Sequence, residues 1–243
     1  MKTKKHQNLT SRGFVLVASR RYIFYKRAIL CAETLREHYP DANITLFTHE
    51  EWVDDDCDIF DKVITSIPTN KRAKMWALAR TPYDLTMYLD ADVQIHDPEI
   101  ATCFDIIPDD VDILMTRIRP YAAAITQFPG GELTWHCGVF LFRKNKIMCE
   151  LMQRWYDDYN EQQTQWKFDE NLYPRSLQPW DTWTFWKLIN IDGYNDKINI
   201  GRFPDDARWN FHYLRYGELE NKSIIIYHNT IRKSYNHERD LIK

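Results

Sequence analysis

Short apolar runs alternate with helix-like segments in the first part of the chain, and this alternation limits the folds it can adopt. Runs rich in β-branched and aromatic residues predict buried strands, and apolar residues three or four apart predict helices. Such alternation is typical of an α/β fold with a mostly parallel central sheet, covered by helices on both faces. The predicted strands are 13–19, 43–48, 62–67 and 84–89, and the predicted helices are 22–39 and 71–80.

The second half of the chain predicts further strands for the same sheet. They cover 111–116, 138–142 and 223–227, with an amphipathic helix over 147–162. Residues 163–185 are rich in Trp, Gln and Pro, and we expect an irregular segment lined by aromatic side chains there. With 243 residues, no internal repeat and no low-complexity linker, the chain is expected to form one compact domain.

Composition excludes several classes of protein. Apolar residues make up 44% of the chain and charged residues 28%, an ordinary globular mixture. A net charge of −3 gives no general basic field for nucleic acid. No apolar run approaches the roughly 20 residues that a membrane helix needs, and no signal peptide is recognisable. The five cysteines lack CxxC spacing, which favours reduced thiols, and we expect a cytoplasmic protein.

Two aspartates follow the predicted strand 84–89 in the stretch MYLDADVQIHDP. Asp90 and Asp92 are two positions apart, so in an extended chain both side chains leave on the same side. Ligands of open α/β sheets bind beyond the carboxyl ends of the strands, where these carboxylates are expected. Paired carboxylates suit Mg²⁺ or Mn²⁺, which bind oxygen ligands together with substrate phosphates. A turn capped by its own side chains is the alternative interpretation.

Any phosphate would need a metal or basic side chains, because the chain has seven glycines and no Gly-rich phosphate loop. His228 follows the predicted strand 223–227 and could complete an Asp–Asp–His metal site. Arg232 and Lys233, just beyond, are candidates for neutralising a diphosphate. The alternatives are a hydrogen-bonded histidine at a strand terminus and a solvated basic tail.

Basic and aromatic residues precede the aspartates. Lys71, Arg72 and Lys74 lie on one predicted helix, and Lys74 could reach a phosphate if that helix lies against the strand ends. An ordinary solvated helix face is the alternative. Tyr22 opens the first predicted helix and is a candidate for stacking on a nucleobase or for local packing.

Five stretches along the chain carry a family resemblance: VASRRYIFYKRAILCAETL, KMWALARTPYDLTMYLDADVQIHDP, WHCGVFLFRKN, PWDTWTFWKLIN and IIIYHNTIRK. In this order they resemble GT-A glycosyltransferases of the family-8 type, which includes glycogenin and bacterial lipopolysaccharide galactosyl- and glucosyltransferases. They span about residues 13–235. The chain departs from that pattern with His136 in place of Asn, Thr182 in place of Gln and no Gly after His228. Lys233 is also one residue closer to His228 than in the pattern.

The resemblance implies the GT-A fold and a single domain, 1–243, with a nucleotide-sugar-binding half at about 13–100 and an acceptor-side half at about 101–243. It implies sugar transfer from a nucleoside-diphosphate sugar, with a UDP-sugar as the expected donor and retention of the anomeric configuration. The metal it implies is Mn²⁺ or Mg²⁺. The predicted metal ligands are Asp90, Asp92 and His228, and the predicted donor-binding residues are Ala18, Ser19, Tyr22, Lys74, Asp90, Ala91, Asp92, Arg232 and Lys233.

Asp181 and His136 are the predicted catalytic residues. An inverting reaction needs a carboxylate base facing the acceptor hydroxyl, and Asp181 is the first candidate for it. In a retaining reaction Asp181 would bind the donor sugar or position the acceptor, and His136 could do similar work. The alternatives are a helix N-cap for Asp181 and a hydrogen-bonded loop residue for His136.

The acceptor is open at this stage. A soluble glycan, a lipopolysaccharide core precursor, a protein side chain and a hydroxylated base of viral DNA are all compatible with the sequence. A sugar nucleotidyltransferase is disfavoured because the Gly-rich loop is lacking, and a non-catalytic nucleotide- or sugar-binding module is the other alternative. The basic residues that could form a groove for nucleic acid are Arg117, Arg119, Arg143, Lys144, Lys146, Arg232, Lys233 and Arg239.

Overall fold

A seven-stranded mixed sheet runs through the molecule, in the order β10-β6-β9-β4-β1-β2-β3. A computed structural model describes residues 11–117, 127–128, 131–132, 135–164, 177–212, 219 and 221–228. The sheet is mostly parallel, and β9 is antiparallel to both of its neighbours, β4 and β6. Its strands are β1 Arg12–Val17, β2 Ile44–Phe47, β3 Lys62–Ile64, β4 Leu85–Leu89, β6 Ile113–Arg117, β9 Trp135–Arg143 and β10 Ile200–Arg202.

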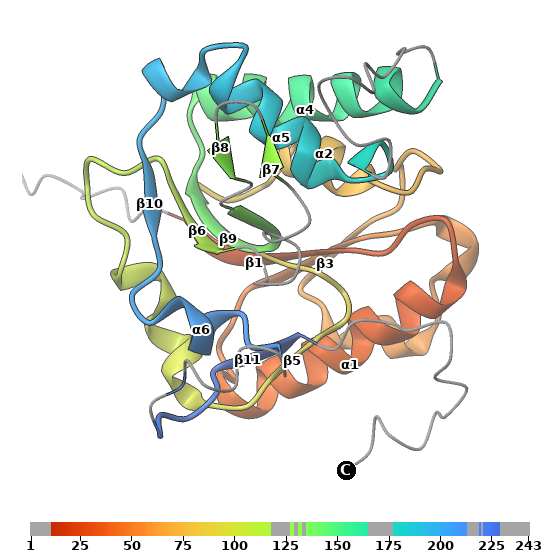
Figure 1. The fold of residues 1–243 in the computed structure, drawn as a ribbon. Coiled ribbons are helices and arrows are strands. Elements are labelled where there is room, and N and C mark those ends of the chain that lie inside the picture. The colour runs from red at the N-terminus through yellow and green to blue at the C-terminus, as the bar shows by residue number, and fades with distance from the viewer. Residues whose placement is uncertain are drawn as a thin grey trace, which may run out of the picture.

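Helices cover both faces of the sheet (Figure 1). Helix α1, Tyr22–His38, lies on one face with α6, Asp206–Trp209. The other face carries α2 Ala73–Leu78, α4 Lys146–Thr164 and α5 Asp181–Asn190. Short 3₁₀ helices in the described part of the chain are η1 Glu50–Trp52, η2 Asp55–Ile59, η3 Pro98–Asp105 and η5 Tyr194–Asp196.

Side chains of the central strands alternate between these two layers. In β9, Val139 and Leu141 join the core beneath α1, whereas Phe140 and Phe142 join the core beneath α2, α4 and α5. The neighbouring strand β4 follows the same pattern, because successive side chains of a strand point to opposite faces. The sheet is therefore buried on both sides, as its continuous apolar runs predict.

A separate two-stranded ribbon lies beside α1. Strand β5, Val93–Ile95, pairs antiparallel with β11, Ile226–His228, and His228 is opposite Val93. A second small ribbon pairs β7, Gln127–Phe128, with β8, Gly131–Glu132. The first ribbon joins the chain just after the two aspartates to a segment near the end of the sequence.

The predicted α/β fold, with a mostly parallel sheet between two helical layers, is confirmed. Most element boundaries agree with the predictions to within a few residues. The irregular segment predicted over 163–185 is wrong at both ends, because α4 continues to Thr164 and α5 begins at Asp181. In α5 the aromatic residues that suggested an irregular lining, Trp183, Phe185 and Trp186, are buried on a helix. Residues 165–176 lie outside the described part of the chain.

Removing the side chain of Leu141 tests the shared core. Leu141 is fully buried in β9, so Leu141→Ala should lower the free energy of unfolding by about 2–5 kcal/mol through lost burial and a residual cavity. Urea unfolding followed by circular dichroism measures this loss. The matched control is Ile191→Ala, whose side chain is 52% exposed and should change stability by no more than about 0.5 kcal/mol. Equal effects of the two substitutions would contradict this core assignment.

Candidate active site

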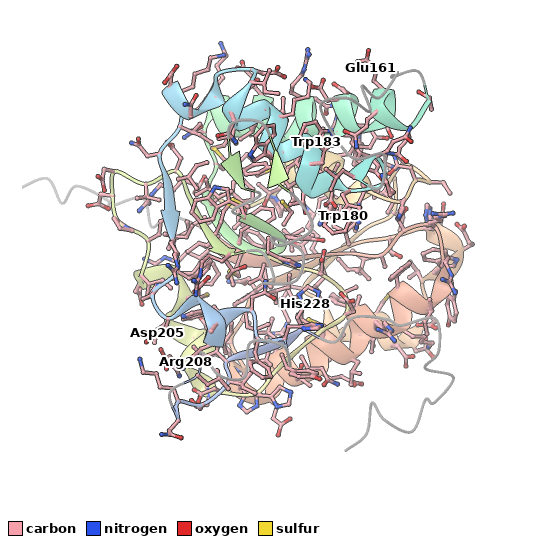
Figure 2. The ribbon with its side chains drawn as sticks, in the orientation of Figure 1. Glu161, Trp180, Trp183, Asp205, Arg208 and His228 are labelled. Carbon is pink, nitrogen blue, oxygen red and sulfur yellow. The ribbon has the colours of Figure 1, made fainter. Side chains whose placement is uncertain are left out.

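Three possible metal ligands meet at the carboxyl edge of the central sheet. Asp90 and Asp92 follow β4, and the β5–β11 pairing brings His228 beside them. His228 Nε2 lies 3.3 Å from Asp92 Oδ1 and 3.9 Å from Asp90 Oδ2. One ligand atom from each residue lies within 4.8 Å of the others. Figure 2 shows His228 at the ribbon, below the central sheet in this view.

The residues of this group fit a divalent cation. Two carboxylates and one imidazole nitrogen are metal ligands that suit Mn²⁺ or Mg²⁺. Gly138 leaves the space for them: a Cβ at this position would lie 2.5 Å from Asp90 Oδ2 and 2.7 Å from His228 Cε1. A side chain at position 138 would therefore displace two of the three candidate ligands.

Asp90 is oriented by two donors on the side away from His228. Its Oδ1 atom accepts a hydrogen bond from the Tyr88 hydroxyl at 2.6 Å and lies 3.3 Å from Lys74 Nζ. Burial, reinforced by the Asp90 carboxylate, raises the pKa of Tyr88 well above its ordinary value, so the phenol stays a donor. Asp90 Oδ2 is thereby left facing His228.

Lys74 is the centre of a buried charge network. Its ammonium lies 2.9 Å from Asp181 Oδ2 and donates to the Cys137 carbonyl at 2.6 Å. Burial disfavours the ammonium, but Asp181 and Asp90 outweigh it, so the pKa of Lys74 is raised. Arg72 Nε lies 3.1 Å from Asp181 Oδ1. Burial likewise opposes the Asp181 carboxylate, yet Arg72 and Lys74 hold its pKa below the ordinary value.

A cavity of 510 Å³ opens in front of these groups. Arg20, in the tight connection from β1 to α1, has a left-handed backbone with φ 70°, and its amide donates to His49 Nε2. The cavity is lined by Val17, Ser19, Arg20, Arg21, Phe24, Lys71, Arg72, Ala73, Lys74, Tyr88, Asp90, Ala91 and Asp92.

The structure places five of the twelve predicted site residues in the lining of this cavity. The five that line it are Ser19, Lys74, Asp90, Ala91 and Asp92.

Other predicted residues lie beside or behind the cavity lining. Ala18 is fully buried, and its amide donates to the Phe47 carbonyl. The Tyr22 ring is 46% exposed, lies 6.2 Å from the Trp52 ring and is not among the lining residues. Asp181 contacts Lys74, and the His136 ring lies 5.1 Å from the His228 ring. Arg232 and Lys233 lie outside the described residues.

Sequence reasoning missed several residues that build the site. Tyr88 had a usable signal, because it is two positions before Asp90 on an extended strand and so shares its side. Arg72 was interpreted as a candidate for a solvated helix face, although it pairs with buried Asp181. Asn210 and Gly138 had no local signal, since their roles depend on segments that meet only in the folded chain.

No protein-family model matches the chain, and no curated protein matches it either. Solved structures do. The glycosyltransferase GlyE of Streptococcus pneumoniae TIGR4 superposes with a TM-score of 0.60 and 17% identity, over 91% of this chain and 55% of GlyE. This chain thus spans about half the length of the GlyE chain.

Two further structures align over nearly their whole length. The galactosyltransferase LgtC, solved with donor and acceptor sugar analogues, has a TM-score of 0.53 and 14% identity, over 90% of this chain and 87% of LgtC. Mouse xyloside xylosyltransferase 1 has a TM-score of 0.54 and 12% identity, over 90% of this chain and 98% of its own. The chain has the GT-A fold. At these identities the match establishes the GT-A architecture, and the chemistry must be argued from the site.

Replacing Asp181 tests the buried network of this GT-A fold. Asp181→Asn leaves Lys74 and Arg72 with one fewer counter-charge in a buried place, so the free energy of unfolding should fall by about 3–5 kcal/mol. Urea unfolding measures the change. As a control, Asp205→Asn removes an exposed ion pair with Lys222 and should cost at most about 1 kcal/mol. If both substitutions have the same small effect, Asp181 does not hold the network together.

Proposed function

We propose that this protein is a metal-dependent glycosyltransferase that moves a sugar from a nucleoside-diphosphate sugar, with UDP as the expected nucleotide, to an acceptor hydroxyl. The observation that carries the proposal is the Asp90–Asp92–His228 group beside a large cavity with a cationic wall. This arrangement suits a ligand in which a diphosphate is joined to uncharged groups, such as a sugar and a nucleoside. The GT-A fold is consistent with it.

The cationic wall supports an anionic ligand. Arg20, Arg21 and Lys71 line the cavity, and within the described part of the chain none of them forms an ion pair. Burial and the neighbouring Arg72 lower the pKa of Lys71, so a bound anion would relieve this crowding of positive charge. A diphosphate is an anion of suitable size and charge for this wall.

Asp90, Asp92 and His228 would hold the divalent ion, Mn²⁺ or Mg²⁺. When bound there, such an ion supplies Lewis-acid stabilisation to a departing diphosphate. Tyr88 and Lys74 keep the Asp90 carboxylate in place for this task. Arg72 and Lys74, which line the cavity, would contact the donor, while Asp181 behind them keeps both cations charged and fixed.

The state of Asp181 favours retention of configuration in this proposal. A general base needs a pKa near the working pH, whereas Arg72 and Lys74 hold the pKa of Asp181 below its ordinary value. Among the described lining residues the carboxylates are Asp90 and Asp92, which are assigned to the metal. The bond from the anomeric carbon to the diphosphate oxygen breaks, the bond to the acceptor oxygen forms, and the hydroxyl proton passes to the departing diphosphate. Asp181 thus acts as a positioning residue here.

The acceptor is proposed only as a hydroxyl compound, with glycans, lipopolysaccharide precursors, protein side chains and modified nucleic-acid bases as candidates. Four of the basic residues that were candidates for a nucleic-acid groove lie in the described part of the chain, and each of them has an intramolecular partner. Arg117 pairs with Asp206, Arg143 donates to the Val111 carbonyl, Lys144 donates to the Thr81 carbonyl and Lys146 pairs with Glu150. No helix among the described residues is long and apolar enough to span a membrane.

The proposal predicts metal-dependent binding of a nucleotide sugar. UDP-sugars should raise the melting temperature in the presence of Mn²⁺ and much less in its absence, because ligands that bind the folded state stabilise it. At one hundred times Kd the gain is about 2.7 kcal/mol. Thermal shift with a panel of UDP-sugars measures this, and release of UDP in the presence of candidate acceptors reports turnover.

Two matched variants sharpen the experiment. Asp92→Asn should abolish the metal-dependent shift, whereas Asp109→Asn, at a fully exposed position, should leave it unchanged. Binding without any turnover across the acceptor panel would favour the non-catalytic binding module. Formation of a nucleotide sugar from a nucleoside triphosphate would favour a nucleotidyltransferase. Absence of any nucleotide-sugar binding with either metal would overturn the proposal.

A further inference from the structure

We infer that Asn210 and His136 are positioning residues that fix the proton of His228 on Nδ1, so that Nε2 faces Asp90 and Asp92 as a bare lone pair. The inference builds on the metal site of the proposed function but concerns residues outside the three ligands. It follows from a chain of hydrogen bonds that starts at the backbone of β9 and ends at His228. Each step fixes the donor or acceptor role of the next atom.

The chain starts at a donor whose role cannot change. The Gly138 backbone N–H donates to His136 Nδ1 at 3.1 Å. A ring nitrogen that accepts a hydrogen bond carries no proton. His136 Nδ1 is therefore an acceptor, and in the neutral ring its proton lies on Nε2.

The acceptor at His136 then fixes the orientation of the Asn210 amide. The side-chain atom of Asn210 that faces His136 Nδ1 at 3.0 Å must be a donor, which makes it the Nδ2 amino group. Nδ2 also donates to Thr116 Oγ1 at 2.9 Å, and the Thr116 hydroxyl points to the Val139 carbonyl at 3.3 Å. Both contacts agree on one amide orientation, which would otherwise be ambiguous.

The amide orientation in turn fixes the tautomer of His228. Asn210 Oδ1 lies 2.8 Å from His228 Nδ1 and, as a carbonyl oxygen, can only accept. Nδ1 of His228 therefore carries the proton and donates it. The other nitrogen, Nε2, is left unprotonated in the neutral ring, 3.3 Å from Asp92 Oδ1. A histidine ligand requires this arrangement, in which the second nitrogen donates to a carbonyl or carboxylate oxygen.

The opposite amide orientation would give a different site. With Nδ2 facing His228, Nδ1 would accept, and Nε2–H would donate to the Asp92 carboxylate. That arrangement makes a hydrogen-bonded histidine at a strand terminus and no metal ligand. The network through Asn210 thus distinguishes the two interpretations of His228 that the sequence left open.

Asn210 is held on a rigid support. It is 3% exposed at the end of α6, and the adjacent Trp209 packs against Phe203 with ring centroids 5.2 Å apart. In the same helix Arg208 forms a two-point contact with Glu99. Figure 2 shows Arg208 on α6 and Asp205 just before it, next to the ribbon that carries His228. The backbone adds a direct tie, since the His228 amide donates to the Phe211 carbonyl at 2.8 Å.

The tautomer can be measured in the metal-free wild-type protein. Long-range ¹H–¹⁵N correlation spectra of histidine-labelled protein, recorded well above the ordinary histidine pKa of about 6.5, distinguish protonated from bare ring nitrogens. We expect His228 to show a protonated Nδ1 and a bare Nε2, and His136 the reverse. Assignment uses His228→Gln and His136→Phe. A protonated Nε2 on His228 would overturn the inference, whatever the metal affinity.

Variants of Asn210 test the consequence for metal binding. Calorimetric titration with Mn²⁺ alone should give a Kd about 10–100-fold weaker for Asn210→Leu, the usual effect of losing a residue that orients a ligand. Asn210→Asp keeps an oxygen acceptor for His228 Nδ1–H and should lose less affinity than Asn210→Leu. The matched control is Asn190→Leu, at an exposed residue that ends α5, which should bind Mn²⁺ like the wild type.

The outcomes separate this inference from the proposed function. Unchanged Mn²⁺ affinity in a folded Asn210→Leu protein would overturn the positioning role. If Asn210→Leu fails to fold, His136→Phe serves as the second variant. Phe keeps an aromatic ring but lacks the nitrogen that accepts from Asn210, so Mn²⁺ binding should weaken and His228 should show a mixture of tautomers. A wild-type protein that binds no divalent ion would refute the metal-dependent function, while the tautomer of His228 would still support or refute the hydrogen-bond relay.

Discussion

The rest of the site depends on the ion pairs that the buried Lys74 ammonium forms with two carboxylates. The ammonium lies between the carboxylates of Asp90 and Asp181 and also binds the carbonyl of Cys137. These three partners belong to the end of β4, the start of α5 and strand β9. Without this ammonium, the carboxylates of Asp90 and Asp181 would repel each other, and the Cys137 carbonyl would lose its hydrogen-bond donor. With it, the carboxyl edge of the sheet can carry Asp90 and Asp92 in a fixed geometry.

Close approach of backbone and side chains is the second constraint. Gly138 lets β9 pass beside Asp90 and His228, and the ribbon of β5 and β11 lies on the other side of the site. Negative charge at the end of β4 is matched by Lys74 from one layer, and His228 from the other layer lies beside the two aspartates. The paired aspartates thus lie with His228 in one candidate metal-binding group.

Features encoded locally could be predicted from the sequence. The strand before Asp90, the shared direction of Asp90 and Asp92, and a strand at His228 all follow from short stretches with clear periodicity. The burial of Lys74 and the pairing of Arg72 and Lys74 with Asp181 could not, because a basic helix is ordinarily solvated and Asp181 is distant in sequence. The first part of α5 was predicted as irregular because Trp183, Phe185 and Trp186 resemble a loop lining in composition, although they lie on the buried face of the helix. Asn210 follows a helix of only four residues, which no periodicity can reveal.

The position of His228 in the chain has a consequence for the order of assembly and for fraying. Strands β1, β2, β3 and β4 are parallel neighbours near the start of the chain and can pair early during synthesis. His228 arrives on β11, a strand of three residues whose partner β5 is equally short. Short peripheral ribbons open at lower free energy than a central sheet. The three candidate ligands are therefore expected to come together late in folding and to separate early on partial opening. If they hold the proposed cation, its binding would report on a fully closed chain.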